Sequence, residues 1–374
     1  MLKIDCDFPG GNILVERIED DTLYLSPDMR DTAGSWFYWA FRLRGAAGRR
    51  LDIRFTAHNP VGMRGPALSC DGGLNWQWSR EPFTTDSFTL TVPQGQDDLL
   101  VTFAPLYTQA EWERFLEGRA PAGGWQRNVL CRSRKGRDVE WLALGAPSDT
   151  AAHRVVFTAR HHCCEMIANF VMEGIIDGIL GADEAGAWLR RQTAFCLIPF
   201  ADKDGVEDGD QGKNRQPRDH NRDYVGESIH VETAAIRDFL PRWGGAPGFD
   251  AAIDLHCPWI RGQHNDVVYQ VGRESPAVWR EQQRFGTLLE ERVPSGALPY
   301  FVASNLPFGE AWNTAANYSA GMSFSRWSAG LPGIRLPTSF EIPYAEASGV
   351  AVTPDAARGL GRGIAHALAA YLSA

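Results

Sequence analysis

The chain has 374 residues, 44% of them hydrophobic and 22% charged, which is typical of a globular protein with one large domain or two smaller ones. Its formal net charge of -9 argues against a nucleic-acid partner, because nucleic acids are bound by basic faces. No stretch approaches the roughly 18 apolar residues that span a membrane. The N-terminal residues also lack the apolar core of a signal peptide. We therefore expect neither a nucleic-acid nor a membrane partner.

The cysteines indicate the compartment. There are seven, an odd number, and Cys163 and Cys164 are adjacent. Neither feature suits a framework of disulfide bonds, which form in oxidising compartments. The sequence therefore predicts a reduced, cytoplasmic protein, and it does not indicate an oligomeric state.

The N-terminal region, residues 1–108, has the pattern of short strands. Residues 51–56 alternate apolar and polar side chains, which is the period of a half-buried strand. Residues 36–41, 88–92 and 99–103 are further strand candidates. We predict an antiparallel β-sandwich. Because the region holds no cluster of titratable side chains, we expect it to be an accessory domain.

The second domain is predicted to cover residues 109–374, with a short helix over residues 107–117 and a hinge over residues 120–124 at its start. Beyond residue 126, strand-like runs alternate with helical ones, which predicts an α/β/α domain with a mixed central sheet. The strand-like runs are residues 129–132, 139–144, 154–159, 195–199 and 251–256. The helical runs are residues 165–180, 229–240, 275–292 and 354–373. Gly174 and Gly178 weaken the first of these helices, so we expect them to allow a close approach to the sheet.

A possible metal site begins where strand 154–159 ends. His162 would lie at the mouth of this strand and Glu165 in the first turn of the next helix, so that both side chains share one face. His256 ends strand 251–256, and ligands of such sheets gather at the carboxyl ends of the strands. Two imidazoles and one carboxylate are a zinc-ligand set that leaves a fourth position open, as in catalytic sites. We expect one zinc ion per chain.

A long loop, residues 198–224, lies between these ligands. It is rich in Asp, Gly, Asn and Arg and poor in core-forming residues. Long loops inside compact domains are usually functional. Its guanidinium groups, those of Arg215, Arg218 and Arg222, suggest the clamping of a carboxylate or an oxyanion.

Ordered segments along most of the chain resemble the M14 family of zinc carboxypeptidases, and its cytosolic carboxypeptidase branch in particular. The similar segments are residues 159–165 (the family's A-R-x-H-P-G-E), 202–206 (N-P-D-G-V), 219–222 (D-L-N-R), 254–256 (D-x-H), 339–341 (the segment with its catalytic Glu) and 131–139 (the start of its catalytic domain). Residues 36–38 and 69–76 resemble signatures of that branch's N-terminal β-sandwich. The resemblance therefore implies that the chain folds as a β-sandwich followed by an α/β/α zinc-carboxypeptidase domain.

One departure from the family pattern concerns the metal site. Cys163 and Cys164 replace the Pro-Gly of the first motif. Cysteine is itself a zinc ligand, so an alternative coordination or an inhibited, oxidised state stays open.

The resemblance implies roles for the residues around the metal. His162, Glu165 and His256 would bind zinc. Asp219 would accept the other ring N–H of His162 and fix its tautomer. Glu341 would be the general base that takes a proton from water and passes it to the leaving amine.

The resemblance also implies how a substrate is held. Arg215 would polarise the scissile carbonyl and stabilise the oxyanion. Asn221 and Arg222 would hold the terminal carboxylate, and Tyr318 would be the mobile tyrosine that covers the substrate. Arg326 would favour acidic C-terminal residues through a charge-assisted contact, unless it faces solvent or pairs with an acidic neighbour.

The leading hypothesis is a zinc metallocarboxypeptidase that removes the C-terminal residue of peptides or proteins. The same ligands and base could instead deacylate small N-acyl amino acids. A third hypothesis, from another class, is a binding protein whose β-sandwich recognises a partner and whose zinc half has decayed. Intact ligands and an intact base favour the peptidase.

Overall fold

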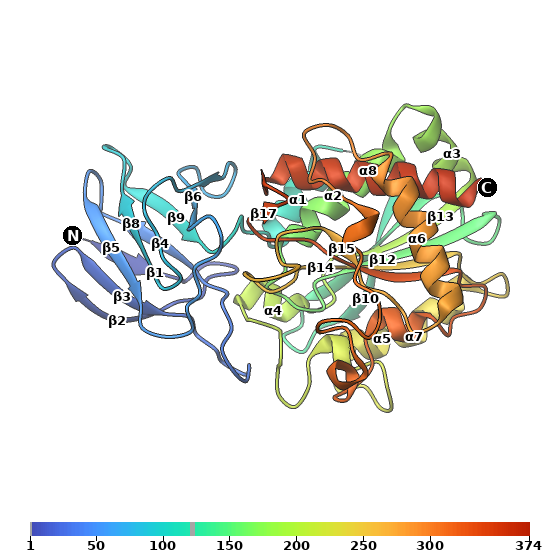
Figure 1. The fold of residues 1–374 in the computed structure, drawn as a ribbon, viewed down its shortest axis with the longest axis horizontal. Coiled ribbons are helices and arrows are strands. Elements are labelled where there is room, and N and C mark those ends of the chain that lie inside the picture. Colours follow the sequence, from blue (N-terminus) through green and yellow to red (C-terminus); the bar gives the residue numbers. More distant parts are fainter. Residues whose placement is uncertain (1, 120–123) are drawn as a thin grey trace.

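The computed structural model describes residues 2–119 and 124–374, so the hinge predicted at residues 120–124 lies outside the described residues except for Gly124. Two parts lie side by side: an N-terminal part made of strands and a larger part in which helices surround a sheet (Figure 1). The two described termini lie at opposite ends of the molecule (Figure 1). The predicted order, a β-sandwich and then an α/β/α domain, is confirmed.

The N-terminal part consists of two sheets. One has the strand order β1-β4-β9-β6-β7 and the other the order β2-β3-β5-β8. The strands are β1 (Lys3–Asp5), β2 (Leu14–Glu19), β3 (Thr22–Ser26), β4 (Ala40–Arg44), β5 (Arg50–Phe55), β6 (Ala67–Ser69), β7 (Gln77–Trp78), β8 (Ser87–Thr91) and β9 (Asp98–Thr102). The described pairs are antiparallel, as predicted, except that β3 and β5 run parallel.

The strand predicted over residues 36–41 begins only at Ala40. The residues before it, Phe37, Tyr38 and Trp39, are nevertheless almost completely buried. Phe37 packs edge-on against Trp259 of the second domain, with ring centres 4.9 Å apart, whereas Trp39 packs inside the β-sandwich against Phe55 and Phe88. Dense aromatic sequence therefore indicated burial here, and the prediction of a strand was wrong for residues 36–39.

The central sheet of the second part has the order β10-β11-β13-β12-β14-β16-β15. Its strands are β10 (Trp125–Arg132), β11 (Asp138–Gly145), β12 (His153–Ala159), β13 (Thr193–Ile198), β14 (Ala251–His256), β15 (Tyr269–Gln270) and β16 (Leu336–Glu341), and β17 (Glu346–Ala347) pairs with β18 (Val350–Ala351) outside it. The inner strands β13, β12, β14 and β16 are parallel and both edges are antiparallel, so the sheet is mixed. The inner strands are fully buried, which explains their continuous apolar sequence.

Helices cover both faces of this sheet. They are α1 (Gln109–Glu117), α2 (Ile167–Leu180), α3 (Glu184–Gln192), α4 (Lys203–Asp208), α5 (Val231–Gly244), α6 (Pro276–Glu290), α7 (Phe324–Ser328) and α8 (Pro354–Leu372). In Figure 1, α2, α3, α6 and α8 lie on one side of the sheet, and α5 and α7 on the other. Several helices start at side-chain caps, such as Thr108 at α1 and Thr353 at α8. The loop 198–224, predicted to lack structure, contains α4 and a single-turn 3-10 helix, His220–Arg222.

Gly174 and Gly178 do not approach the sheet as predicted, because their neighbour is α8. A Cβ atom on Gly174 would lie 2.0 Å from the carbonyl oxygen of Arg358, and one on Gly361 of α8 would lie 2.0 Å from the carbonyl oxygen of Val171. The two helices therefore cross with their backbones in contact. Glycine is required on both sides of this crossing because no side chain fits between the helices.

We predict that Gly174→Ala destabilises the protein by about 1–3 kcal/mol, because the added methyl group must push α2 and α8 apart. Denaturant unfolding would measure this loss as a lower midpoint. Gly62→Ala is the matched control, since a Cβ atom there meets nothing within 4 Å. Equal stability of the two variants would contradict the tight crossing.

The two parts meet through buried polar contacts as well as aromatic ones. The Gln211 side chain accepts the N–H of Tyr38 at 2.7 Å and donates to its carbonyl at 2.8 Å. The Trp78 indole donates to the carbonyl of Val352 at 2.8 Å. The boundary between residues 108 and 109 stays a prediction, and Thr108 lies there as the cap of α1.

Candidate active site

The three predicted metal ligands come together at the carboxyl ends of two neighbouring strands. β12 and β14 pair in parallel, so that His162, which follows β12, and His256, the last residue of β14, lie at the same edge of the sheet. Glu165 lies in a turn just before α2, where its N–H bonds the carbonyl of His162 at 3.1 Å. The sequence predicted Glu165 in the first turn of the helix, but α2 begins two residues later, at Ile167. The side chain of Glu165 nevertheless reaches the two histidines.

The ligand atoms of these residues all lie within 4.8 Å of one another. Nδ1 of His256 is 2.7 Å from one oxygen of Glu165, and Nδ1 of His162 is 2.9 Å from the other. Two imidazole nitrogens and a carboxylate are the donors that zinc takes at about 2.0–2.2 Å. These residues therefore fit the metal that the sequence predicts.

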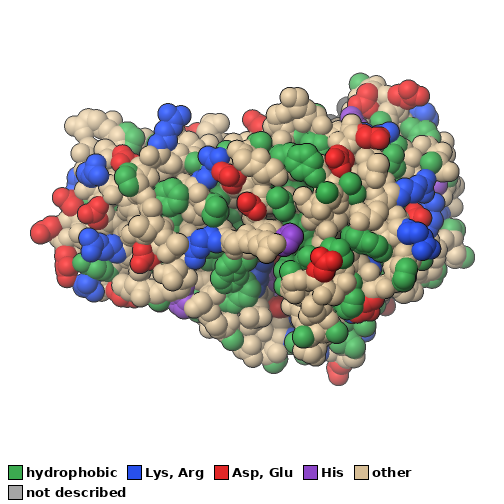
Figure 2. Space-filling view, viewed as in Figure 1, with side chains coloured by type: hydrophobic (Ala, Val, Ile, Leu, Met, Phe, Trp, Pro, Cys, Tyr) green, Lys and Arg blue, Asp and Glu red, His purple; other side chains and the backbone are tan. Residues whose placement is uncertain are grey.

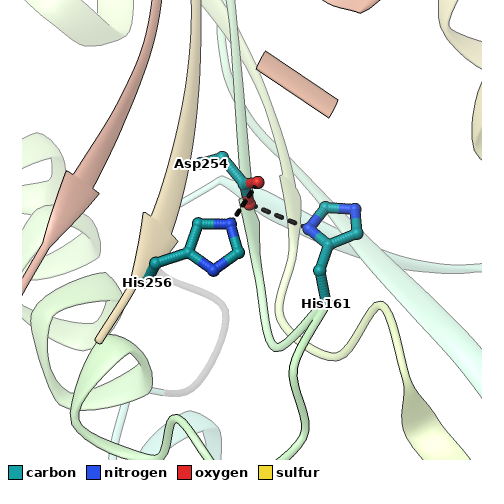
Figure 3. Close-up of side chains that lie close together, drawn as sticks. All are labelled: His161, Asp254 and His256. Carbon is teal, nitrogen blue, oxygen red and sulfur yellow. Dashed lines mark hydrogen bonds and ion pairs between the residues drawn. The ribbon is translucent and has the colours of Figure 1, made fainter. Parts of the chain in front are cut away.

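Asp254 orients His256 from behind. Its carboxylate lies between two imidazoles, 2.6 Å from Nε2 of His256 and 2.9 Å from Nδ1 of His161 (Figure 3). The ring of His161 also contacts the hydroxyl of Tyr224 at 2.8 Å. Burial acts to raise the pKa of Asp254, but the two rings hold it below its usual value. A charged Asp254 fixes the proton of His256 on Nε2 and leaves Nδ1 free for a metal.

Asp219 is the predicted partner of the other ring, and it lies 3.6 Å from Nε2 of His162. Burial would raise the pKa of Asp219, but His162 and the guanidinium of Arg222 keep it below its usual value. In both imidazoles, Nε2 therefore faces the carboxylate of an aspartate. Nδ1 points toward Glu165 and is available to bind a metal. His161, which joins this arrangement, was missed by sequence reasoning, and only its position beside His162 could have pointed to it.

The two cysteines face away from the metal ligands. The thiol of Cys163 contacts the carbonyl of Asp210 at 3.1 Å, and that of Cys164 lies 3.6 Å from the hydroxyl of Tyr344. Burial raises the pKa of Cys164 to about 11, so its thiol stays protonated at neutral pH. Within the described residues, the groups able to hold a metal contain no cysteine.

Glu341 ends β16 and pairs in register with His256 on the neighbouring strand. It lines the same pocket as the three ligands and is only 9% exposed. Burial raises its pKa to about 7. A carboxylate with a pKa near neutrality can both accept and return a proton, which is what a general base requires.

Lys213 lies in the ligand pocket, where the resemblance implied Arg215. Its ammonium lies in the ligand pocket, 2.7 Å from Glu165, and donates to the carbonyl of Cys257 at 2.8 Å. Burial lowers the pKa of Lys213, but Glu165 and Glu341 outweigh this effect and keep the side chain charged. Sequence reasoning missed Lys213, although it lies two residues before Arg215 in the same loop.

Arg215 points elsewhere. Its guanidinium pairs with three carboxylates, those of Asp202 at 3.1 Å, Asp210 at 2.8 Å and Asp31 at 3.1 Å. It lines the cavity between the two parts of the molecule and is not among the described residues around the ligand pocket. The three carboxylates hold Arg215 on the other side of the loop, so its role in the reaction stays a prediction that this position does not favour.

The ligand pocket has a volume of about 320 Å³ and contains the predicted substrate-binding residues Asn221, Arg222 and Tyr318. The amide of Asn221 is held by the N–H of Phe324 at 3.0 Å. Arg222 lies over the ring of Tyr318, 5.5 Å from its centre. A charged guanidinium beside an aromatic ring at one wall suits the binding of a carboxylate.

Indole rings form the outer wall of this pocket. Trp36, Trp259 and Trp312 all line it, and Trp259 and Trp312 are 37% and 38% exposed. Trp36 comes from the N-terminal part and meets Trp259 edge-on, with ring centres 4.9 Å apart. The β-sandwich is therefore part of the pocket.

Arg326 lies behind Tyr318 and does not line the pocket among the described residues. Its guanidinium is 3.7 Å from the centre of the Tyr318 ring and 2.7 Å from the carboxylate of Glu274. It thus has an acidic partner, although this is a different residue from the Glu346 that the sequence suggested. Glu346 pairs with Arg64 at 2.7 Å.

Two further observations concern the charges on the surface and the apolarity of the helices. On the face in Figure 2, acidic and basic side chains are interspersed, and the cations form only small groups. Across residues 2–119 and 124–374, no helix combines the length and apolarity needed to span a membrane.

Known proteins resemble this chain in sequence and in fold. Residues 126–252 match the M14 peptidase family, described as zinc carboxypeptidase. Cytosolic carboxypeptidase 6 of Caenorhabditis elegans is 23% identical over 68% of this chain and 62% of its own length. Cytosolic carboxypeptidase 2 of Homo sapiens is 30% identical over 60% of this chain and 29% of its own length. This chain thus spans less than two thirds of the length of either relative.

Solved structures share the whole fold. A metallo-carboxypeptidase from Burkholderia cenocepacia is 19% identical, with a TM-score of 0.77 over 100% of this chain and 99% of that one. A metallo-carboxypeptidase from Pseudomonas aeruginosa is 20% identical, with a TM-score of 0.77 over 99% of both chains. The β-sandwich and the α/β/α domain therefore occur together in other proteins.

The mixed sheet and the donor set at its edge define the class of metallohydrolases. Within that class, residues 126–252 match the M14 family of zinc carboxypeptidases, as the sequence motifs predicted. Cytosolic carboxypeptidases are similar in sequence to about two thirds of the chain, and solved metallo-carboxypeptidases share its fold. This family implies a zinc cofactor.

Proposed function

We propose that this protein is a zinc-dependent carboxypeptidase that binds one catalytic zinc ion through His162, Glu165 and His256. One observation carries the proposal: these three donors converge in a pocket that also contains a buried carboxylate, Glu341, and a guanidinium, Arg222. A metal, a base and a clamp for a carboxylate are the parts that removal of a C-terminal residue requires. The cytosolic location of the named relatives supports a cytoplasmic site of action.

The residues of the pocket divide the reaction between them. A bound zinc ion would supply Lewis-acid activation of water and of the scissile carbonyl. Glu341 takes the proton of the attacking water and returns it to the nitrogen of the leaving amino acid. Arg222 and Asn221 hold the terminal carboxylate of the peptide, and Tyr318 covers it.

Lys213 takes the role first assigned to Arg215. Its ammonium is buried, charged and inside the pocket, so it stabilises the negative charge that develops on the carbonyl oxygen. The carbonyl of Cys257 and the carboxylate of Glu165 already hold the ammonium in place. A cation fixed before the reaction needs little rearrangement to stabilise the transition state.

Zinc content and peptide hydrolysis test this function together. We expect His256→Ala to lower the zinc content by about one ion per chain and to leave the fold intact, because the site joins strands that are already packed. Elemental analysis and circular dichroism measure the two effects. Undiminished zinc would show that His256 is not a ligand. Release of amino acids from N-acyl amino acids, but not from peptides, would instead indicate a deacylase.

We also propose a preference for acidic C-terminal residues, favoured by the guanidinium of Arg326, which lies 3.7 Å from the centre of the Tyr318 ring. For peptides ending in Glu, kcat/KM should exceed that for Leu by about tenfold, the size of one charge-assisted contact. Arg326→Ala should reduce this ratio. Glu274→Gln, which frees Arg326 from its partner, should increase it. A wild-type preference for Leu or Phe would reject the proposal.

A further inference from the structure

A second cluster of metal-ligating side chains lies behind the candidate active site. A cavity of about 1050 Å³ between the β-sandwich and the α/β/α domain is lined by His220, His230 and Glu232. Each of the three offers a ligand atom within 4.8 Å of the other two, and all three are buried. None of them has a role in the proposed reaction.

The distances in this cluster exceed those of hydrogen bonds. Nε2 of His220 is 3.5 Å from a carboxylate oxygen of Glu232, and Nδ1 of His220 is 3.6 Å from an oxygen of Asp202. Two donors that bind one tetrahedral zinc ion at 2.0–2.1 Å lie about 3.3–3.4 Å apart. The spacing of His220 and Glu232 therefore suits a shared ion better than a direct hydrogen bond.

Two buried polar atoms beside the cluster make no hydrogen bond within the described residues, namely Nδ1 of His220 and the facing oxygen of Asp202. The ion pair of this Asp202 oxygen with Arg215, at 3.1 Å, leaves Nδ1 of His220 without a close partner. Glu232 is 4% exposed, and its one ionic contact with a described residue is the distant ring of His220. A buried carboxylate without a close partner is costly, and a bound cation removes that cost.

His230 completes the donor set. Its Nε2 donates to the carbonyl of Arg218 at 2.9 Å, which leaves Nδ1 unprotonated and able to bind a metal. Its ring stacks on that of His220, with centres 3.7 Å apart and an angle of 20° between the planes. One of the two rings must turn for both nitrogens to bind the same ion.

We propose that His220, His230 and Glu232 form a second metal site, with Asp202 opposite and the cavity supplying the remaining ligands as water. Two imidazoles select a zinc-type ion over magnesium or calcium, which take oxygen ligands. The carboxylates of Glu232 and Asp202 supply the negative charge for a divalent ion. Arg215 neutralises part of that charge, because it pairs with the same oxygen of Asp202 that faces His220.

The second ion would brace the turn that holds the substrate. Four successive residues of this turn face different ways: Asp219 lies behind His162, His220 belongs to the second cluster, and Asn221 and Arg222 line the ligand pocket. Fixing His220 fixes the backbone on which the substrate-binding residues stand. The second site thus has a structural connection to the first without sharing a ligand.

Metal counting on the full chain tests the proposal. The protein is stripped with a chelator, dialysed against excess zinc and then against metal-free buffer, and analysed for zinc and protein. The wild type should hold two ions, Glu232→Gln one, His256→Ala one, and the combined variant none. Gln216→Ala, which changes the same cavity but no ligand, should hold two.

The separate variants distinguish the two sites. A wild type with one ion that Glu232→Gln does not reduce would overturn the second site and leave the catalytic one standing. Loss of an ion in Glu232→Gln but not in His256→Ala would overturn the catalytic assignment alone. If circular dichroism shows that Glu232→Gln is unfolded, His230→Gln replaces it, with the same expected loss of one ion. When cobalt is bound to His256→Ala, the second site should give a visible absorption band. Adding His230→Gln should abolish this band, and a band that persists would also overturn the proposal.

Discussion

Glu341→Gln should lower turnover of peptides by at least about 10²-fold, the low end of a general-base contribution. The substitution is nearly isosteric and removes only the ability to accept a proton. Zinc content and substrate affinity should stay close to those of the wild type, because none of the proposed ligands changes. Single-turnover kinetics with elemental analysis would separate the chemical step from binding and metal loss.

The position of Glu341 makes this test specific. It is buried beside His256 on the neighbouring strand, so a purely structural role would show as lost stability or lost zinc. Glu346→Gln serves as the control, because Glu346 pairs with Arg64 instead. Wild-type turnover in Glu341→Gln would show that the proposed mechanism is wrong.

Lys213→Met should lower kcat by about 10²–10³-fold, the usual cost of removing one group that stabilises an oxyanion. Lys213→Arg should retain part of the activity, because the positive charge remains. Zinc content must be measured alongside, since Lys213 also neutralises Glu165. A fall in kcat with zinc still bound would support direct action on the substrate.

Arg215→Lys is the matched control for Lys213. It preserves the charge beside Asp202, Asp210 and Asp31 but loses the planar geometry that polarises a carbonyl. We expect its kcat to stay within about threefold of the wild type, because the side chain lies outside the pocket. A larger loss than in Lys213→Met would restore the role first predicted for Arg215.

The sequence by itself determined the elements and the convergence of three side chains, those of the proposed metal ligands. Strands such as β12 and β14 and helices such as α2 and α8 lie within a few residues of their predicted positions. These predictions succeeded because they depend on local periodicity and on the rule that ligands gather at the carboxyl ends of parallel strands. The three proposed ligands converge for the same reason: His162 and Glu165 are near neighbours in the chain, and His256 ends a strand.

Only the tertiary structure decided which side chains face the ligand pocket. Lys213 and Arg215 lie two residues apart in one loop, and no local pattern says which of them enters the pocket. Arg215 is turned away by carboxylates that come partly from the β-sandwich, through Asp31, and Lys213 is drawn in by Glu165. The direction of a charged side chain in a loop depends on the charges that folding brings beside it, which lie far away in the sequence. His220 and Glu232 lie together for the same reason, because only folding brings the 3-10 turn that carries His220 beside α5, which carries Glu232.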